Sequence, residues 1–290
     1  MTIKHSQVIC DTNIWYNLGS GTISPPVEIE LIATWSNVIE LAYAHPKNKI
    51  DFDINKWKQA AKAILRHSTT IIELDPFEFA TKRLFPDYSS FSKRNLKSVL
   101  TVISETDNPL ADSIYLKNQK LFDSFISIKD DFVNKLLQFK NDARSEFIKS
   151  SVLKETFKKN QKEYLKIRTA DILFDIDAYL SEKNETIIFD NQTDIQESLK
   201  KVEQEFNFYV SVKQRFLHNL TLMKLMSVQP NDFIDLTNLM YVDKATYYTT
   251  LENRWLTLIS EAGQTDKLIK IESGKWTLPQ LTKIIERLDD

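Results

Sequence analysis

The chain has 290 residues, of which 42% are hydrophobic and 27% are charged, and its formal net charge is −2. This is the composition of an ordinary globular protein, far from that of a disordered chain, and the balanced charge indicates no particular partner. Four glycines are too few for the clustered glycines of a phosphate-binding loop, and one cysteine allows no internal disulfide. Walker-type NTPase and Rossmann chemistry are therefore disfavoured.

Histidine spacing and hydropathy narrow the class of protein further. The four histidines are scattered, and no HxH, HExxH or CxxC spacing occurs, which argues against a zinc site with nitrogen and sulfur ligands. The sequence contains no uncharged run of 18 residues and no N-terminal basic segment followed by an apolar one. These features predict a cytoplasmic protein without membrane segments.

The first 85 residues predict alternating strands and helices. A short apolar strand ends at the polar sequence Asp11-Thr12-Asn13. Beyond it, a Ser-Pro-Pro start and amphipathic spacing predict two helices, and a β-branched segment predicts another strand. In chain order, the expected elements are a strand at 7–10, helices at 24–44 and 55–67, and a strand at 69–74.

The middle of the chain is predicted to be helical, because apolar side chains recur there every three or four residues. Short elements return after Pro230, where Gly263 ends one predicted helix. The expected order is a helix at 231–240, a strand at 246–249, a helix at 252–262, a strand at 267–271 and a last helix opened by a capping box at 277–280. We therefore expect an α/β core from residues 1–85 and 229–290, interrupted by a helical insertion over residues 86–228.

Position selects a few candidates among the forty acidic residues. Asp11 and Glu252 each follow a predicted strand, and open parallel sheets bind ligands at the carboxyl ends of their strands. Glu40 lies among apolar neighbours in a predicted helix. Three further polar residues share one face of the short helix before the 246–249 strand: Asp232, Asp235 and Asn238.

Each of these acids also has a plain structural interpretation. Asp11 can cap a turn, and Glu40 can be a solvated helix residue. The other acids, namely Asp232, Asp235 and Glu252, lie near predicted helix starts, where a carboxylate interacts favourably with the helix dipole. Taken one at a time, the residues leave both interpretations open.

Two segments together resemble the PIN-domain family of nucleases. The sequence Val-Ile-Cys-Asp11-Thr12-Asn13 resembles the first strand and motif of that family. The segment from Asn231 to Glu252 resembles its distal half, in which an acid lies on a helix before a strand and a polar turn follows the strand. The resemblance implies a PIN-like three-layer α/β fold with a central, mostly parallel sheet.

The resemblance also implies a metal-dependent active site. The family's four acids fall on Asp11, Glu40, Asp235 and Glu252, which would bind Mg²⁺ or Mn²⁺. Hard divalent cations prefer oxygen ligands and offset the charge that develops during phosphodiester hydrolysis. The supporting polar residues would be Asn13 and Thr250, with Asp232 and Asn238 on the helix face of Asp235. One departure is Glu252, because the family's fourth acid is usually Asp.

A basic stripe in the predicted insertion offers a surface for RNA. On a helix, four lysines spaced four residues apart would follow a phosphate backbone: Lys154, Lys158, Lys162 and Lys166. A solvated helix face gives the same pattern, and the insertion also leaves room for a protein partner or for a homo-oligomer. The expected function is that of an endoribonuclease. The alternatives are a non-catalytic PIN-like module that binds RNA or protein, and a flap-endonuclease-like DNA nuclease.

Overall fold

The structure is a computed structural model of the chain. It describes residues 6–44, 53–88, 94–105, 192–222 and 226–278, together with short stretches between residues 123 and 181. The longest of these stretches is a helix over residues 126–138. The lysine stripe predicted for the insertion lies outside the described residues.

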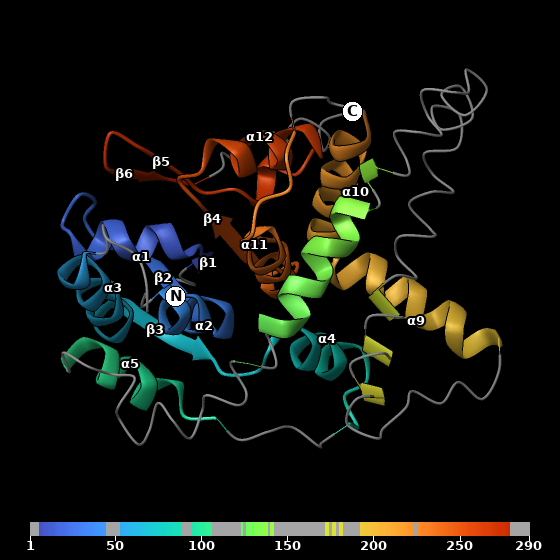
Figure 1. The fold of residues 1–290 in the computed structure, drawn as a ribbon, viewed down its shortest axis with the longest axis horizontal. Helices are drawn as coiled ribbons and strands as arrows, with labels where there is room; N and C mark the ends of the chain where they lie inside the picture. The colour runs from blue at the N-terminus through green and yellow to red at the C-terminus, as the bar shows by residue number, and fades with distance from the viewer. Residues whose placement is uncertain are drawn as a thin grey trace, which may run out of the picture.

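A four-stranded parallel sheet forms the centre of the described chain (Figure 1). Its strands are β1 (Ser6–Cys10), β2 (Ile29–Thr34), β3 (Ser68–Ile72) and β4 (Thr246–Thr249), in the spatial order β3-β2-β1-β4. The inner strand β1 pairs with β2 on one side and with β4 on the other. Strands from both ends of the chain therefore share one parallel sheet, as the sequence predicts.

Helices cover both faces of the sheet and give the fold three layers. Along β1 the buried side chains alternate, because Val8 and Cys10 pack into one apolar cluster and Ile9 packs into another. The first face is covered by α1 (Thr12–Gly19), α2 (Trp35–Ala44), α3 (Ile54–His67) and α5 (Leu96–Glu105). The opposite face is covered by α4 (Pro76–Leu84), α10 (Asn207–Leu222) and α12 (Asn253–Glu261).

The remaining described elements connect these layers. The helix α9 (Gln192–Glu205) precedes α10, and α11 (Asp232–Asn238) continues into the 3-10 turn η2 (Leu239–Tyr241) before β4. After α12 come η3 (Thr265–Lys267) and a separate antiparallel pair, β5 (Lys270–Glu272) and β6 (Lys275–Thr277). The 126–138 helix packs on α11 through Phe132 and Phe233, whose ring centroids are 5.0 Å apart.

The structure corrects the predicted helix over residues 24–44. Ile29–Thr34 form the strand β2, and the helix α2 begins only at Trp35. β2 lies between β1 and β3 and is apolar on both faces, so it lacks the alternation by which a half-buried strand is recognised. The helices α1 and α4 were also not predicted.

The other short elements agree more closely with the prediction. The segments 7–10, 55–67, 231–240, 246–249 and 252–262 correspond to β1, α3, α11 with η2, β4 and α12. Gly263 follows α12 with a φ of 71°, the left-handed conformation expected at a helix end. The predicted strands 69–74 and 267–271 are shifted to β3 and β5. Thr277 ends β6, and the last predicted helix, opened by a capping box at 277–280, lies outside the described residues.

The predicted boundaries between the α/β core and the helical insertion stay a prediction. The helix α5 lies within the predicted insertion but packs in the same apolar cluster as α1 and α3. Within the described residues, no helix is both long enough and apolar enough to cross a membrane.

Candidate functional site

The register of the sheet brings the first predicted acid next to the last strand. Cys10 on β1 pairs with Thr249 on β4, so the residues that follow, Asp11 and Thr250, leave the sheet side by side. The Thr250 hydroxyl donates to Asp11 Oδ2 at 2.6 Å, and the Thr12 backbone N–H donates to Asp11 Oδ1 at 2.7 Å. Asp11 is thus the N-cap of α1 and a buried carboxylate at the C-terminal edge of the sheet. Asp11 can therefore cap a helix and also belong to the candidate site.

Asn13 joins the two halves of this edge. Its side-chain amide donates to Asp11 Oδ2 at 2.6 Å and to the Thr250 hydroxyl oxygen at 3.0 Å. Its side-chain oxygen accepts from the Leu251 backbone N–H at 3.1 Å. The Glu252 backbone N–H donates to the Thr250 hydroxyl oxygen, also at 3.1 Å. Asn13 and Thr250 therefore fix the turn that carries Glu252, in keeping with their predicted supporting roles.

Glu40 lies on α2, the helix that follows β2, and is half-buried. The pKa of its carboxyl is raised to about 7, mainly by burial and in addition by the negative charges of Asp11 and Glu252. A hydrogen bond from Thr12 and the ammonium of Lys129 act in the opposite direction on this pKa. Glu40 is thus within electrostatic range of two other predicted acids, as the resemblance implies.

Asp235 lies on α11 and is buried, with its Oδ2 accepting from the Trp255 indole N–H at 3.1 Å. Burial raises the pKa of Asp235 well above its usual value, and the charges of Asp11, Glu40 and Glu252 add to the effect. Burial likewise raises the pKa of Asp11 to about 6, against the lowering effect of the Thr250 hydrogen bond. Three acids thus have raised pKa values, and Glu252 contributes repulsion to each of them.

The four predicted acids consequently lie within electrostatic range of one another, although each comes from a different element. Asp11 follows β1, Glu252 follows β4, and Glu40 and Asp235 lie on α2 and α11. Carboxylates that repel one another are a donor set that fits a hard dication. Among the residues that the structure describes, however, no three His, Cys, Asp or Glu side chains stand in a ready-made metal cage. Mg²⁺ usually retains several waters and takes only one or two carboxylates directly, so an open arrangement still suits it.

The two other predicted supporting residues face neighbouring helices and strands. Asp232 is fully buried and forms a bidentate ion pair with Arg254, at 2.6 and 3.0 Å. Asn238 accepts a hydrogen bond from the Thr34 hydroxyl at 2.7 Å and thereby ties α11 to the end of β2. Their role in support of the site stays a prediction.

Sequence reasoning missed Asn37, a buried residue that organises the same edge from α2. Its amide donates to the Cys10 carbonyl oxygen and to the Thr12 hydroxyl oxygen, both at 3.1 Å. Its side-chain oxygen accepts from the Thr34 backbone N–H at 2.8 Å. The position of Asn37 just after the end of β2 would indicate this role, but the sequence predicts a helix over the residues of that strand.

Lys129 was also missed, and it comes from the predicted insertion. It lies on the 126–138 helix and its side chain is only 16% exposed, unusually low for a lysine. On a helix, residues 129, 132 and 136 share one face, and Phe132 and Leu136 of that face pack into the core. The insertion thus brings a positive charge toward Glu40, and no sequence motif marks it.

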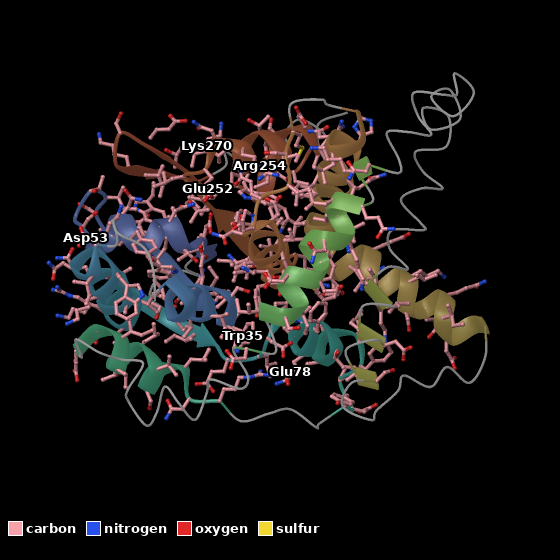
Figure 2. All side chains as sticks on the ribbon, viewed as in Figure 1. Trp35, Asp53, Glu78, Glu252, Arg254 and Lys270 are labelled. Carbon is pink, nitrogen blue, oxygen red and sulfur yellow. The ribbon has the colours of Figure 1, made fainter. Side chains whose placement is uncertain are left out.

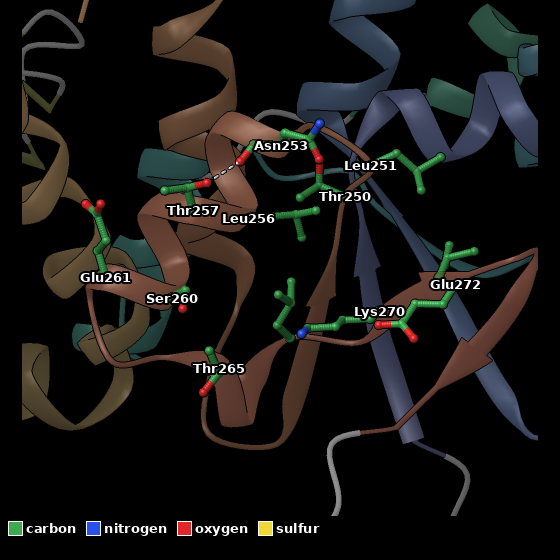
Figure 3. Close-up of a pocket in the computed structure, with 12 residues that line it drawn as sticks. Thr250, Leu251, Asn253, Leu256, Thr257, Ser260, Glu261, Thr265, Lys270 and Glu272 are labelled. Carbon is green, nitrogen blue, oxygen red and sulfur yellow. Dashed lines mark hydrogen bonds between the residues drawn. The ribbon is translucent and has the colours of Figure 1, made fainter.

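A pocket of about 500 Å³ adjoins the Thr250–Glu252 turn, between α12 and β5 (Figure 3). Thr250 and Leu251 line one part of it, and Ser260, Thr265 and Lys270 contribute hydroxyl and ammonium groups. The lining also includes two carboxylates and three large apolar side chains: Glu261, Glu272, Leu256, Leu268 and Ile271. Figure 3 shows the Lys270 side chain extending into the space between the two elements. The volume lies in the usual range for ligand pockets. The pocket therefore provides open room beside Thr250 and Leu251.

The site rests on this geometry and on the resemblance of its motifs. Comparison of the chain with models of protein families, with curated proteins and with solved structures finds no match.

Proposed function

We propose that the protein is a divalent-metal-dependent nuclease, and that its substrate is RNA. The observation that supports the proposal is the electrostatic interaction of four acids near the C-terminal edge of a parallel sheet: Asp11, Glu40, Asp235 and Glu252. This edge is where α/β sheets bind their ligands. Among the described residues, Lys129 is the cation that acts on Glu40, and its single charge is too small to balance four carboxylates. A bound dication would complete the charge balance.

In this proposal, Asp11, Glu40, Asp235 and Glu252 hold Mg²⁺ or Mn²⁺. The ion would supply Lewis-acid stabilisation of the charge that builds on the phosphate oxygens, and would lower the pKa of a bound water. The chain's own groups hold the acids in place: Asn13 and Thr250 orient Asp11, and the Trp255 indole orients Asp235. Such supporting hydrogen bonds typically change metal affinity or activity 10- to 100-fold.

The choice of RNA follows from the resemblance to PIN-domain nucleases. The pocket beside Thr250 has hydroxyls and the Lys270 ammonium, which can bind phosphate and ribose oxygens. It also has the Glu261 and Glu272 carboxylates, which can accept hydrogen bonds from ribose hydroxyls but repel phosphate. The pocket lies next to the acids, so a strand whose phosphate reaches the metal would place a neighbouring nucleotide there. The lysine stripe of the insertion stays a prediction for the more distant part of that strand.

The direct test is a cleavage assay on single-stranded RNA and on structured DNA. We expect purified protein to cleave RNA with Mn²⁺ or Mg²⁺ and to stop when EDTA is added. Binding of RNA without cleavage at any metal concentration would support a non-catalytic module instead. Preferential cleavage of structured DNA would support a flap-endonuclease-like enzyme.

The lysine stripe has its own test. Replacing Lys154, Lys158, Lys162 and Lys166 together should weaken RNA binding and flatten its salt dependence, by ~0.7 in log–log slope for each lost phosphate contact. Turnover at saturating RNA should change little, because such lysines bind ground state and transition state alike. An unchanged salt slope would show that the stripe is a solvated face.

A further inference from the structure

The first turns of α11 and α12 are joined by an ion pair between the buried Asp232 and the partly exposed Arg254. Arg254, on the first turn of α12, donates from Nη1 to Asp232 Oδ1 at 2.6 Å and from Nη2 to Asp232 Oδ2 at 3.0 Å. Its Nη2 also donates to the Ser227 carbonyl oxygen at 3.1 Å, and the Gln229 backbone N–H donates to Asp232 Oδ2 at 2.7 Å. Bidentate arginine–carboxylate pairs are the most directional ion pairs in proteins. Asp232 and Arg254 therefore fix how the two helices meet.

A second contact between the same helices acts on a predicted metal ligand. The Trp255 indole N–H donates to Asp235 Oδ2 at 3.1 Å. The Trp255 ring stacks on Phe216 of α10, with centroids 5.8 Å apart and an interplanar angle of 10°. The Arg254 guanidinium lies 5.5 Å from the Phe216 ring centroid. Arg254 and Trp255 are thus held by the same aromatic ring.

The spacing in the chain makes this contact relevant to the metal site. Asp232 precedes Asp235 by three residues, which places both on one side of α11. Arg254 follows Glu252 by two residues, and Figure 2 shows Glu252 and Arg254 at the same end of α12. Glu252 is exposed, and its carboxylate caps no N–H of α12 among the described residues, so its location depends on where the helix begins.

We propose that Arg254 is a positioning residue for the metal site: its pair with Asp232 sets the separation of Asp235 and Glu252. The proposal rests on the proposed function, since it concerns ligands of the same ion. Arg254 has a second effect, because its positive charge opposes the negative charge of Asp232, whose carboxylate lies close enough to raise the pKa of Asp235.

Mn²⁺ affinity of the RNA-free protein tests the proposal, together with the melting temperature. Arg254→Met should weaken Mn²⁺ binding by about 10- to 100-fold, the usual effect of losing an outer-sphere contact. It should also lower the melting temperature, because Asp232 is left buried and unpaired. Arg254→Lys should restore part of the affinity, since one hydrogen bond to Asp232 can be retained. Arg83→Met is the matched control, because Arg83 pairs with Asp243 outside the acidic cluster.

The double variant Arg254→Met/Asp232→Asn separates positioning from stability. It removes the unpaired buried charge, so the melting temperature should recover relative to Arg254→Met, while Mn²⁺ binding should stay weak because the contact between helices is still broken. Recovery of wild-type affinity in the double variant would overturn the proposal. So would wild-type affinity in Arg254→Met. An absence of Mn²⁺ binding by the wild type would overturn the proposed function as well, so the two failures are distinguishable.

Discussion

Two groups of buried acids lie on adjoining elements of this fold, and their charges are balanced in different ways. In the first group, Asp75 and Glu78 both pair with Arg94, whose side chain is 1% exposed and lies against the Trp35 ring. In the second group, at the edge of the sheet, Asp11, Glu40 and Asp235 repel one another and have raised pKa values. Figure 2 shows Glu78 near Trp35 and well separated from Glu252.

The difference teaches how to interpret a buried carboxylate. Asp75 caps α4 in a capping box with Glu78, and Arg94 ties that helix start to the segment before α5. Those acids have a cation of their own and serve the fold. The acids around Asp11 have hydrogen-bond donors but little positive charge, which is why we propose that they bind a cation from solution.

The largest effect is expected from removing the cation of the first group. Arg94→Met leaves Asp75 and Glu78 buried without their partner, which should lower the free energy of unfolding by about 3–5 kcal/mol. Chemical denaturation would measure this. Mn²⁺ affinity of the folded fraction should be unchanged, and a large loss of affinity would show that the two groups are not independent.

Removing an acid of the second group should reduce activity strongly and change stability little. Asp11→Asn should reduce metal-dependent cleavage by more than about 100-fold, because it replaces a ligand and not merely an outer contact. The metal-free melting temperature should change little, since relief of repulsion offsets the altered hydrogen bonds to Thr250 and Asn13. Equal cleavage by the variant would point to a contaminating nuclease.

The pH dependence of stability should also differ between the groups. Burial raises the pKa of Asp11 from 3.8 to about 6 and that of Glu40 from 4.5 to about 7. A raised carboxyl pKa means that the folded state holds its proton longer, so this contribution to stability is present below pH 4 and is lost as the pH rises to about 7. In metal-free buffer, the difference in unfolding free energy between Asp11→Asn and wild type should therefore shift in favour of the variant over this range. A pH-independent difference would contradict the raised pKa.

The smallest effect is expected from removing Lys129, the cation on the 126–138 helix that acts on Glu40. Lys129→Met removes an ammonium that lowers the pKa of Glu40, so the acid limb of Mn²⁺ binding should move to higher pH by a fraction of a unit. At higher pH, Mn²⁺ should bind more tightly, because one positive charge has left the site. Lys135→Met is the control, since Lys135 lies on the same helix, is 74% exposed and pairs with Asp131. Identical Mn²⁺ binding curves for both variants would remove Lys129 from the site.

The candidate acids of this site could be predicted from the sequence, but few of the residues that surround them could. Asp11 and Glu252 could be found because each follows a short apolar segment that ends in polar residues, a local signal. Glu40 and Asp235 were candidates from their positions on predicted helices, and the resemblance grouped them with Asp11 and Glu252. Other residues around these acids were not predictable, because Asn37, Lys129 and Trp255 reach them through tertiary packing. The strand β2 was missed for a related reason, since burial on both faces removes the alternation that identifies a strand.

The most direct test of the central claim is calorimetric titration of the wild-type protein with Mn²⁺ near pH 7, in two buffers that differ in ionisation enthalpy. The account predicts binding accompanied by the release of about one proton or more, because a dication displaces protons from acids with raised pKa values. Asp11→Asn should bind more weakly and release fewer protons. An absence of Mn²⁺ binding by the wild type, or equal proton release by Asp11→Asn, would contradict the account.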